Sequence, residues 1–108
     1  MTFVVNNQEW ELMFVKPSSR QLMRSDGSIT IGMTDNNTKT VYINNKLNRA
    51  LTDKVICHEL THVFAFEFDY SMDIETEEIV ADFMSLYGRN IIYLLDDLTL
   101  ILKKAYIA

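Results

Sequence analysis

The sequence contains few residues that cross-link a chain or break helices and strands: one cysteine, one proline and three glycines among 108 residues. Its single cysteine, Cys57, cannot form a disulfide within the chain, so nothing indicates an oxidising compartment. The first ten residues lack the basic and apolar regions of a secretory signal, and we therefore expect a cytoplasmic protein. The 48% of hydrophobic residues can form a core, and the length predicts a single domain over residues 1–108.

Clustered positive charge and a long uninterrupted apolar run are also missing. The net charge is −5 at pH 7, and the Lys and Arg residues are scattered along the chain. Phosphate binding needs such residues in clusters, so we expect no nucleic-acid partner. The most apolar stretch, residues 90–108, contains Asp96 and Asp97. Two adjacent acids are costly in lipid, and we therefore expect no membrane span or membrane partner.

The first half of the chain has the patterns of β-strands. Residues 10–16 have the length of a strand and end at Pro17. Residues 28–34 alternate between apolar and polar side chains, residues 35–39 are rich in residues that favour turns, and residues 40–44 again suit a strand. These segments predict a β-hairpin within a small antiparallel or mixed sheet of about three strands.

The second half has helical spacing. One helix is predicted to begin at Asn48 or Thr52, and a second runs from Asp73 or Thr76 to a stop at Gly88. A third is predicted after Asn90. Its main apolar stripe consists of Ile91, Leu94, Leu95, Leu98, Leu102 and Ala105. The apolar residues off this stripe are Ile92, Leu100 and Ile107, which either complete the core, the favoured alternative, or form a homodimer contact. Strands followed by helices indicate an α+β fold.

Both histidines of the chain lie in the segment CHELTH, residues 57–62. On a helix, His58 and His62 face the same way one turn apart, which suits two ligands of a tetrahedral Zn²⁺ ion. Glu59 would flank the ion and could take a proton from a water that the metal acidifies. The alternative is a chance pair of solvated histidines on a surface helix. The strongly apolar helix around the motif argues against this alternative, because unpaired polar groups are costly to bury.

A third metal ligand is expected from the glutamates of the following helix. Glu78 and Asp82 stand four residues apart and share a face, so Glu78 can reach the metal while Asp82 accepts the N–H of a ligand histidine. Glu75 lies on nearly the same face and is the rival third ligand, whereas Glu77 is expected to point away. Alternatively, these glutamates only favour the positive end of a helix.

HELTH followed by a helix with the pattern E-x-x-x-D resembles the gluzincin metallopeptidases. The small size and the element order look most similar to the minimal ImmA/IrrE-type peptidase domains of phages and bacteria. The resemblance covers roughly residues 28–87, and its specific part is the two short motifs. It implies a minimal zincin-like fold, in which the sheet packs on the HExxH helix and the following helices.

The resemblance also implies a function and roles for individual residues. The chain would be a zinc-dependent peptidase that hydrolyses peptide bonds in a peptide or protein substrate. His58, His62 and Glu78 would be the zinc ligands, Glu59 the general base, and Asp82 the partner of a ligand histidine. The alternative function is a catalytically silent zincin-like binding module that holds a protein partner.

Zincins generally bind an extended substrate along an edge strand. The residues expected at that edge are Thr30, Ile31, Gly32 and Met33. Gly32 either permits close approach of a backbone or marks a bulge. The choice among four possible oxyanion-stabilising residues stays open: Tyr42, Tyr70, Tyr87 and Arg89.

Overall fold

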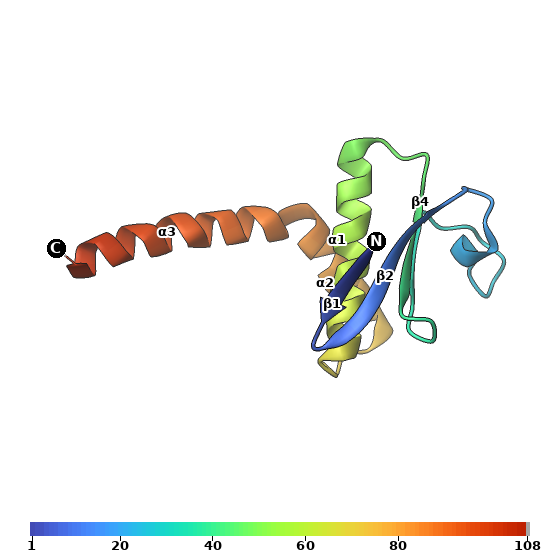
Figure 1. Cartoon of the computed structure of the whole chain (residues 1–108), viewed down its shortest axis with the longest axis horizontal. Coiled ribbons are helices and arrows are strands. Elements are labelled where there is room, and N and C mark those ends of the chain that lie inside the picture. Colours follow the sequence, from blue (N-terminus) through green and yellow to red (C-terminus); the bar gives the residue numbers. More distant parts are fainter. Residues whose placement is uncertain (108) are drawn as a thin grey trace.

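The computed structural model describes residues 1–107 and has an α+β fold, in which a four-stranded sheet lies against a long helix (Figure 1). The strands are β1 (Thr2–Val5), β2 (Gln8–Val15), β3 (Gly32–Asp35) and β4 (Thr40–Asn44), with a short 3₁₀ turn, η1 (Arg20–Leu22), between β2 and β3. The helices are α1 (Arg49–Glu67), α2 (Ile74–Phe83), a π-helical segment η2 (Met84–Gly88) and α3 (Arg89–Ile107).

The sheet is mixed and has the strand order β1-β2-β4-β3. The two outer pairs are antiparallel, whereas β2 and β4 run parallel at the centre. The sheet has four strands where about three were predicted, and the unpredicted one is β1. A two-residue turn joins β1 to β2: Asn6 and Asn7 have φ values of 50° and 63°. Tight hairpins need this left-handed conformation at both positions, and asparagine tolerates it.

The predicted hairpin is present, but its first strand is shorter than expected. Residues 28–34 were predicted to be extended, whereas β3 begins only at Gly32, and Ile29 forms just an isolated bridge with Met23. The alternating pattern before Gly32 therefore belongs to a loop. β3 is an edge strand, as expected for the substrate-binding edge.

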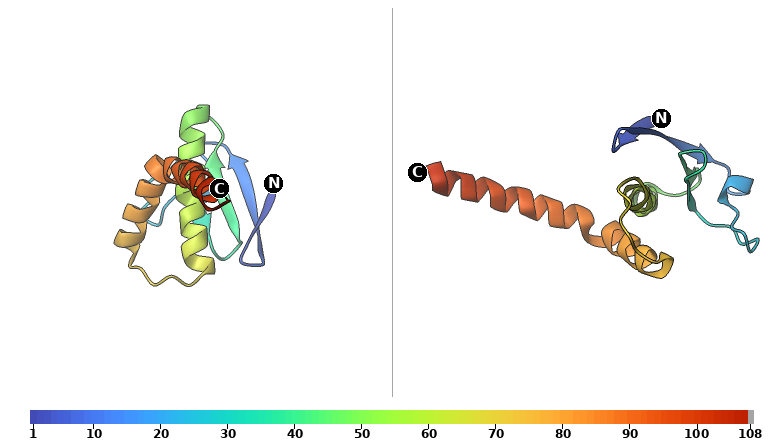
Figure 2. Two further views of the ribbon diagram at one scale, coloured as in Figure 1. Left: turned by 90° about the vertical axis from the view of Figure 1, so that its left-hand side faces the viewer. Right: turned by 90° about the horizontal axis from the view of Figure 1, so that it is seen from below.

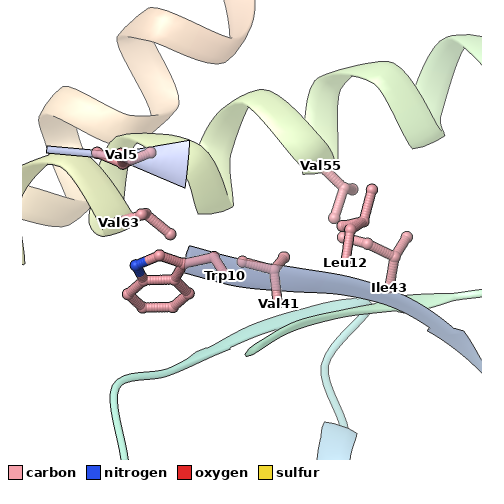
Figure 3. Close-up of a cluster of buried hydrophobic side chains, with 7 residues drawn as sticks. All are labelled: Val5, Trp10, Leu12, Val41, Ile43, Val55 and Val63. Carbon is pink, nitrogen blue, oxygen red and sulfur yellow. The ribbon is translucent and has the colours of Figure 1, made fainter. Parts of the chain in front are cut away.

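The core lies between the sheet and α1 (Figure 3). The central strands contribute Trp10, Leu12, Val41 and Ile43, and α1 contributes Val55 and Val63. Burying a side chain of this kind contributes about 1.5–3 kcal/mol. Because Glu59 lies midway between Val55 and Val63 on the same helical face, this packing also directs Glu59 toward the sheet.

The first two helices begin where the sequence predicts. The Asn48 side chain accepts a hydrogen bond from the backbone N–H of Leu51 at 2.9 Å, and the Asp73 side chain accepts one from Thr76 at 2.7 Å. These caps satisfy N–H groups that have no partner within the helix. The predicted stop at Gly88 is wrong, because the chain continues in helical form from α2 through η2 into α3.

The prediction that Ile92 and Leu100 complete the core is also wrong, because both are exposed, and the side chain of Ile107 lies outside the described part of the structure. Side chains 89–105 of α3 are exposed, and the helix extends away from the sheet (Figures 1 and 2). The molecule is consequently elongated, with principal extents of 59 × 31 × 27 Å. Within residues 1–107, no helix combines the length and apolar character needed to cross a bilayer.

Candidate metal centre

The two histidines of α1 point their Nε2 atoms toward each other. These atoms lie 3.2 Å apart, and the ring centroids are 5.0 Å apart with an angle of 66° between the ring planes. Both rings are partly buried. The geometry follows from the i, i+4 spacing of His58 and His62 on one face of the helix.

Glu78 on α2 completes a group of three facing side chains. Its Oε2 lies 3.2 Å from His58 Nε2, and its Oε1 lies 2.9 Å from His62 Nε2. One ligand atom from each of the three residues lies within 4.8 Å of the other two, so the group could hold a metal ion. Glu75, the alternative third ligand, is exposed on α2 and is not part of this group.

The remaining nitrogen of each histidine faces its own carboxylate. His58 Nδ1 lies 3.0 Å from Asp82 Oδ1, as the sequence predicts, and His62 Nδ1 lies 3.2 Å from Glu77 Oε1. The expectation that Glu77 points away is therefore wrong. His58, the earlier histidine, contacts the later acid, Asp82, whereas His62 contacts the earlier acid, Glu77. The two helices consequently pass in opposite directions, and Glu77 and Glu78 straddle His62.

These contacts leave three electron-pair donors directed at one point. When each Nδ1–H donates to its carboxylate, each neutral imidazole keeps a lone pair on Nε2. The two lone pairs and the Glu78 carboxylate then approach one another at 2.9–3.2 Å. Such an arrangement repels itself unless a cation lies between the donors, so the site is electrostatically suited to a metal ion.

Glu59 lies beside this group and is held by a hydrogen bond from the sheet. Only 7% of the residue is exposed, and Thr34 on β3 donates a hydrogen bond to its Oε1 at 2.9 Å. Burial raises the pKa of the Glu59 carboxyl, and the hydrogen bond from Thr34 opposes that shift. The other carboxylate oxygen, Oε2, lies 4.0 Å from His58 Nε2. Glu59 therefore lies beside the group of His58, His62 and Glu78, here called the metal group, without belonging to it.

Gly32 allows β3 to lie this close to α1. A Cβ atom at this position would come within 2.5 Å of Val55 Cγ1 and 3.2 Å of Glu59 Cγ. Gly32 also pairs in regular register with Ile43 on β4, so it marks no bulge. Of the two expectations for this glycine, the bulge is wrong, and the atoms that its small size admits are side-chain atoms of α1. Close approach of a substrate backbone at Gly32 stays a prediction.

Two adjoining hollows flank the site along β3, with volumes of about 560 and 290 Å³. Both are lined by His58, Glu59, Glu78, Gly32, Thr30 and Arg24. Ile31 lines only the larger hollow, and Met33 only the smaller. The larger continues past Leu51 and Lys54, and the smaller past Asn36 and Ile74. All four predicted edge residues therefore line the open space beside the metal group.

The residues considered as oxyanion stabilisers do not line either hollow: Tyr42, Tyr70, Tyr87 and Arg89. Arg89 instead forms two hydrogen bonds with Asp53 on α1, at 2.7 and 2.9 Å. Arg24, which no sequence motif indicates, lines both hollows. It lies in an irregular segment between η1 and β3, where no periodicity predicts the direction of a side chain.

Cys57 faces away from the metal group. Its Sγ atom lies 3.4 Å from the backbone oxygen of Met84 in η2, and burial raises the pKa of its thiol. A thiol held in the protonated form is a poor metal ligand. Cys57 therefore serves as a small packing residue between α1 and η2.

Comparison with protein-family models, with curated proteins and with solved structures finds no match to this chain. The resemblance to gluzincins therefore rests on the two motifs and on the geometry of the residues that carry them.

Proposed function

We propose that the chain is a zinc-dependent peptidase with a minimal zincin-like fold. The observation that carries the proposal is the convergence of two Nε2 atoms and one carboxylate, with both Nδ1 atoms already facing carboxylates. Tetrahedral zinc with bonds of about 2.0–2.2 Å would place its ligand atoms about 3.3 Å apart. The two Nε2 atoms lie 3.2 Å apart, and each lies within 3.2 Å of one oxygen of Glu78, Oε2 for His58 and Oε1 for His62. One ligand atom from each residue lies within 4.8 Å of the other two, which supports a shared ion.

The arrangement gives each residue a role in peptide hydrolysis. Zinc, when bound, would polarise a carbonyl and acidify a water. Glu59 would take the proton of that water and later deliver it to the leaving amine, and a pKa raised by burial suits both steps. Thr34 donates a hydrogen bond to Oε1 of Glu59. The other oxygen, Oε2, lies on the side of His58 and would exchange the proton.

The open edge of β3 supports a peptide as the substrate. An edge strand presents unpaired backbone N–H and C=O groups, and an extended peptide can pair with them. The hollows on both sides of the metal group would then receive side chains before and after the cleaved bond. Arg24 lines both hollows and is well placed to contact a substrate carbonyl or carboxylate.

The decisive experiment combines metal analysis with a peptide-cleavage assay. We expect one zinc per wild-type chain and cleavage of members of a mixed peptide library. Glu59→Gln should keep the zinc and lose cleavage by about 10²–10⁴-fold, because it removes the general base. His58→Ala should lose both, whereas Glu75→Gln, which alters a glutamate outside the site, should lose neither.

Absence of zinc affinity in the folded wild-type protein would overturn the proposal. A different outcome would favour a catalytically silent binding module. In that case the wild type binds zinc but cleaves no peptide of the library, and the Glu59→Gln variant keeps the biological activity of the wild type.

A further inference from the structure

The projecting helix α3 presents a continuous apolar face to solvent. Leu94, Leu98 and Ile101 are 59%, 49% and 62% exposed. The base of the helix is tied to α1 by the ion pair between Arg89 and Asp53, whose hydrogen bonds lower the pKa of Asp53. Figure 2 shows α3 extending away from the rest of the molecule. Because its apolar side chains are exposed, this face is available to a partner.

The apolar residues of α3 follow the spacing of a coiled coil. Ile91, Leu98 and Ala105 recur every seven residues, and Leu94 and Ile101 lie three residues after the first two. This alternation of three and four residues produces a narrow seam that packs against a second helix. Leu95 and Leu102 lie beside the seam and widen it on one side.

Charges on the other side of the seam select the partner and its direction. Asp97 and Lys104 lie one heptad apart, about 100° and 120° around the helix from Leu98. In an antiparallel pair of identical helices, Asp97 of each copy would face Lys104 of the other. Two-fold symmetry forms this ion pair twice. A parallel pair would place Asp97 near Leu102 of the other copy and form neither ion pair.

We propose that α3 pairs antiparallel with α3 of a second copy of this chain. Leu94 packs against Ala105 of the other copy, Leu98 packs against its Ile101, and the two ion pairs flank these layers. The bases of the two helices then lie about 30 Å apart along the pair, at 1.5 Å per residue. The α1–α2 bodies lie at opposite ends, which leaves both metal centres open.

The first test is sedimentation of the full chain with two matched leucine substitutions. We expect a dimer for the wild type. Leu98→Asp should increase the dimer dissociation constant at least a hundredfold, because it introduces two charges into the seam. Leu100→Asp is the control: Leu100 is 56% exposed on the opposite face of the same helix, and its substitution should leave the dimer intact. Far-UV circular dichroism checks that both variants fold.

Exchange of the flanking charges tests the register. Asp97→Lys and Lys104→Asp should each raise the dissociation constant about tenfold, because two attractive pairs become two repulsive ones. The double variant restores both pairs with reversed signs and should return the dissociation constant to near the wild-type value. These positions are exposed, so neither substitution threatens the fold.

The relative direction of the two α3 helices is tested by the distance between spin labels attached to the Asn90→Cys variant in a Cys57→Ser background. The antiparallel pair predicts roughly 30 Å between labelled positions, whereas a parallel pair predicts about 10 Å. A monomeric wild type at all concentrations, a short label distance, or a double charge variant no tighter than the single ones would overturn the proposal. So would a monomer that binds phosphatidylcholine–phosphatidylserine vesicles through α3, which would assign the apolar face to a membrane surface.

Discussion

At the scale of single residues, the group that could hold a metal ion is supported by two carboxylates that are not part of it. Asp82 and Glu77 lie 3.0 and 3.2 Å from the Nδ1 atoms of His58 and His62. A carboxylate that accepts the N–H of Nδ1 favours the tautomer in which Nε2 carries the lone pair. The same contacts orient both rings, so that both Nε2 atoms face the Glu78 carboxylate.

Removing either acceptor should therefore weaken zinc binding without removing a ligand. We expect Glu77→Gln and Asp82→Asn each to lower zinc affinity about 10–100-fold, because an amide can offer its N–H and rotate the imidazole. Competition with a chromophoric chelator measures the affinity. Glu75→Gln is the matched control on the same helix and should bind zinc as the wild type does. Unchanged affinity in Glu77→Gln would show that His62 needs no such acceptor.

Residue roles were predictable from the sequence where spacing within a helix or a motif carried by two helices indicates them, and not where only the packed fold brings residues together. The i, i+4 spacing was enough to place His58 with His62 and Glu78 with Asp82. Thr34 and Glu77 were missed because their contacts cross from strand to helix and from helix to helix. The direction in which α2 passes α1 decides which glutamate reaches His62, and that direction is a property of the packed fold.

At the scale of elements, the distance between β3 and α1 determines the shape of the site. Gly32 sets this distance, because any side chain there would collide with Val55. The strand that supplies the hydrogen bond to Glu59 is also an edge strand of the sheet. Under the proposed function, a shift of β3 would therefore disturb the general base and the peptide-binding edge together.

Gly32→Ala should therefore destabilise the fold by about 1–3 kcal/mol, the usual range for overpacking. The added methyl would lie 2.5 Å from Val55 Cγ1, so a second substitution, Val55→Ala, should recover part of the loss by removing that carbon. Urea unfolding of the wild type, both single variants and the double variant measures this coupling. Strictly additive losses would mean that β3 and α1 move apart freely, contrary to the geometry.

Elements with local signals were predicted well, and those without them were not. Asn48 and Asp73 mark helix starts because their side chains cap their own backbone. The strand β1 was missed because its four residues carry only a weak pattern of their own and become a strand by pairing with β2. Gly88 was misread as a stop. It is buried in η2, where an added Cβ would meet Met84 Cε at 2.7 Å, so its small size serves packing.

At the scale of the whole molecule, the residues that could hold a metal ion come from two helices joined by a loop. His58 and His62 belong to α1, whereas Glu78 belongs to α2, and a bound ion would join them. Without a cation, the site gathers the carboxylates of Glu59, Glu77, Glu78 and Asp82 around the two imidazoles. Repulsion among these groups opposes the packing of α2 on α1, so metal binding and folding should be coupled.

Zinc removal should consequently lower the thermal stability of the protein. A ligand that binds only the folded state at a hundred times its dissociation constant adds about 2.7 kcal/mol. For a chain of this size, that corresponds to a rise in Tm of about 10 °C. Calorimetry with zinc and with excess EDTA measures the difference, and His62→Ala, which removes a ligand, should show almost none. An equal zinc-dependent rise in the wild type and in His62→Ala would place the bound ion away from the α1–α2 site, because stabilisation there requires ligands from both helices.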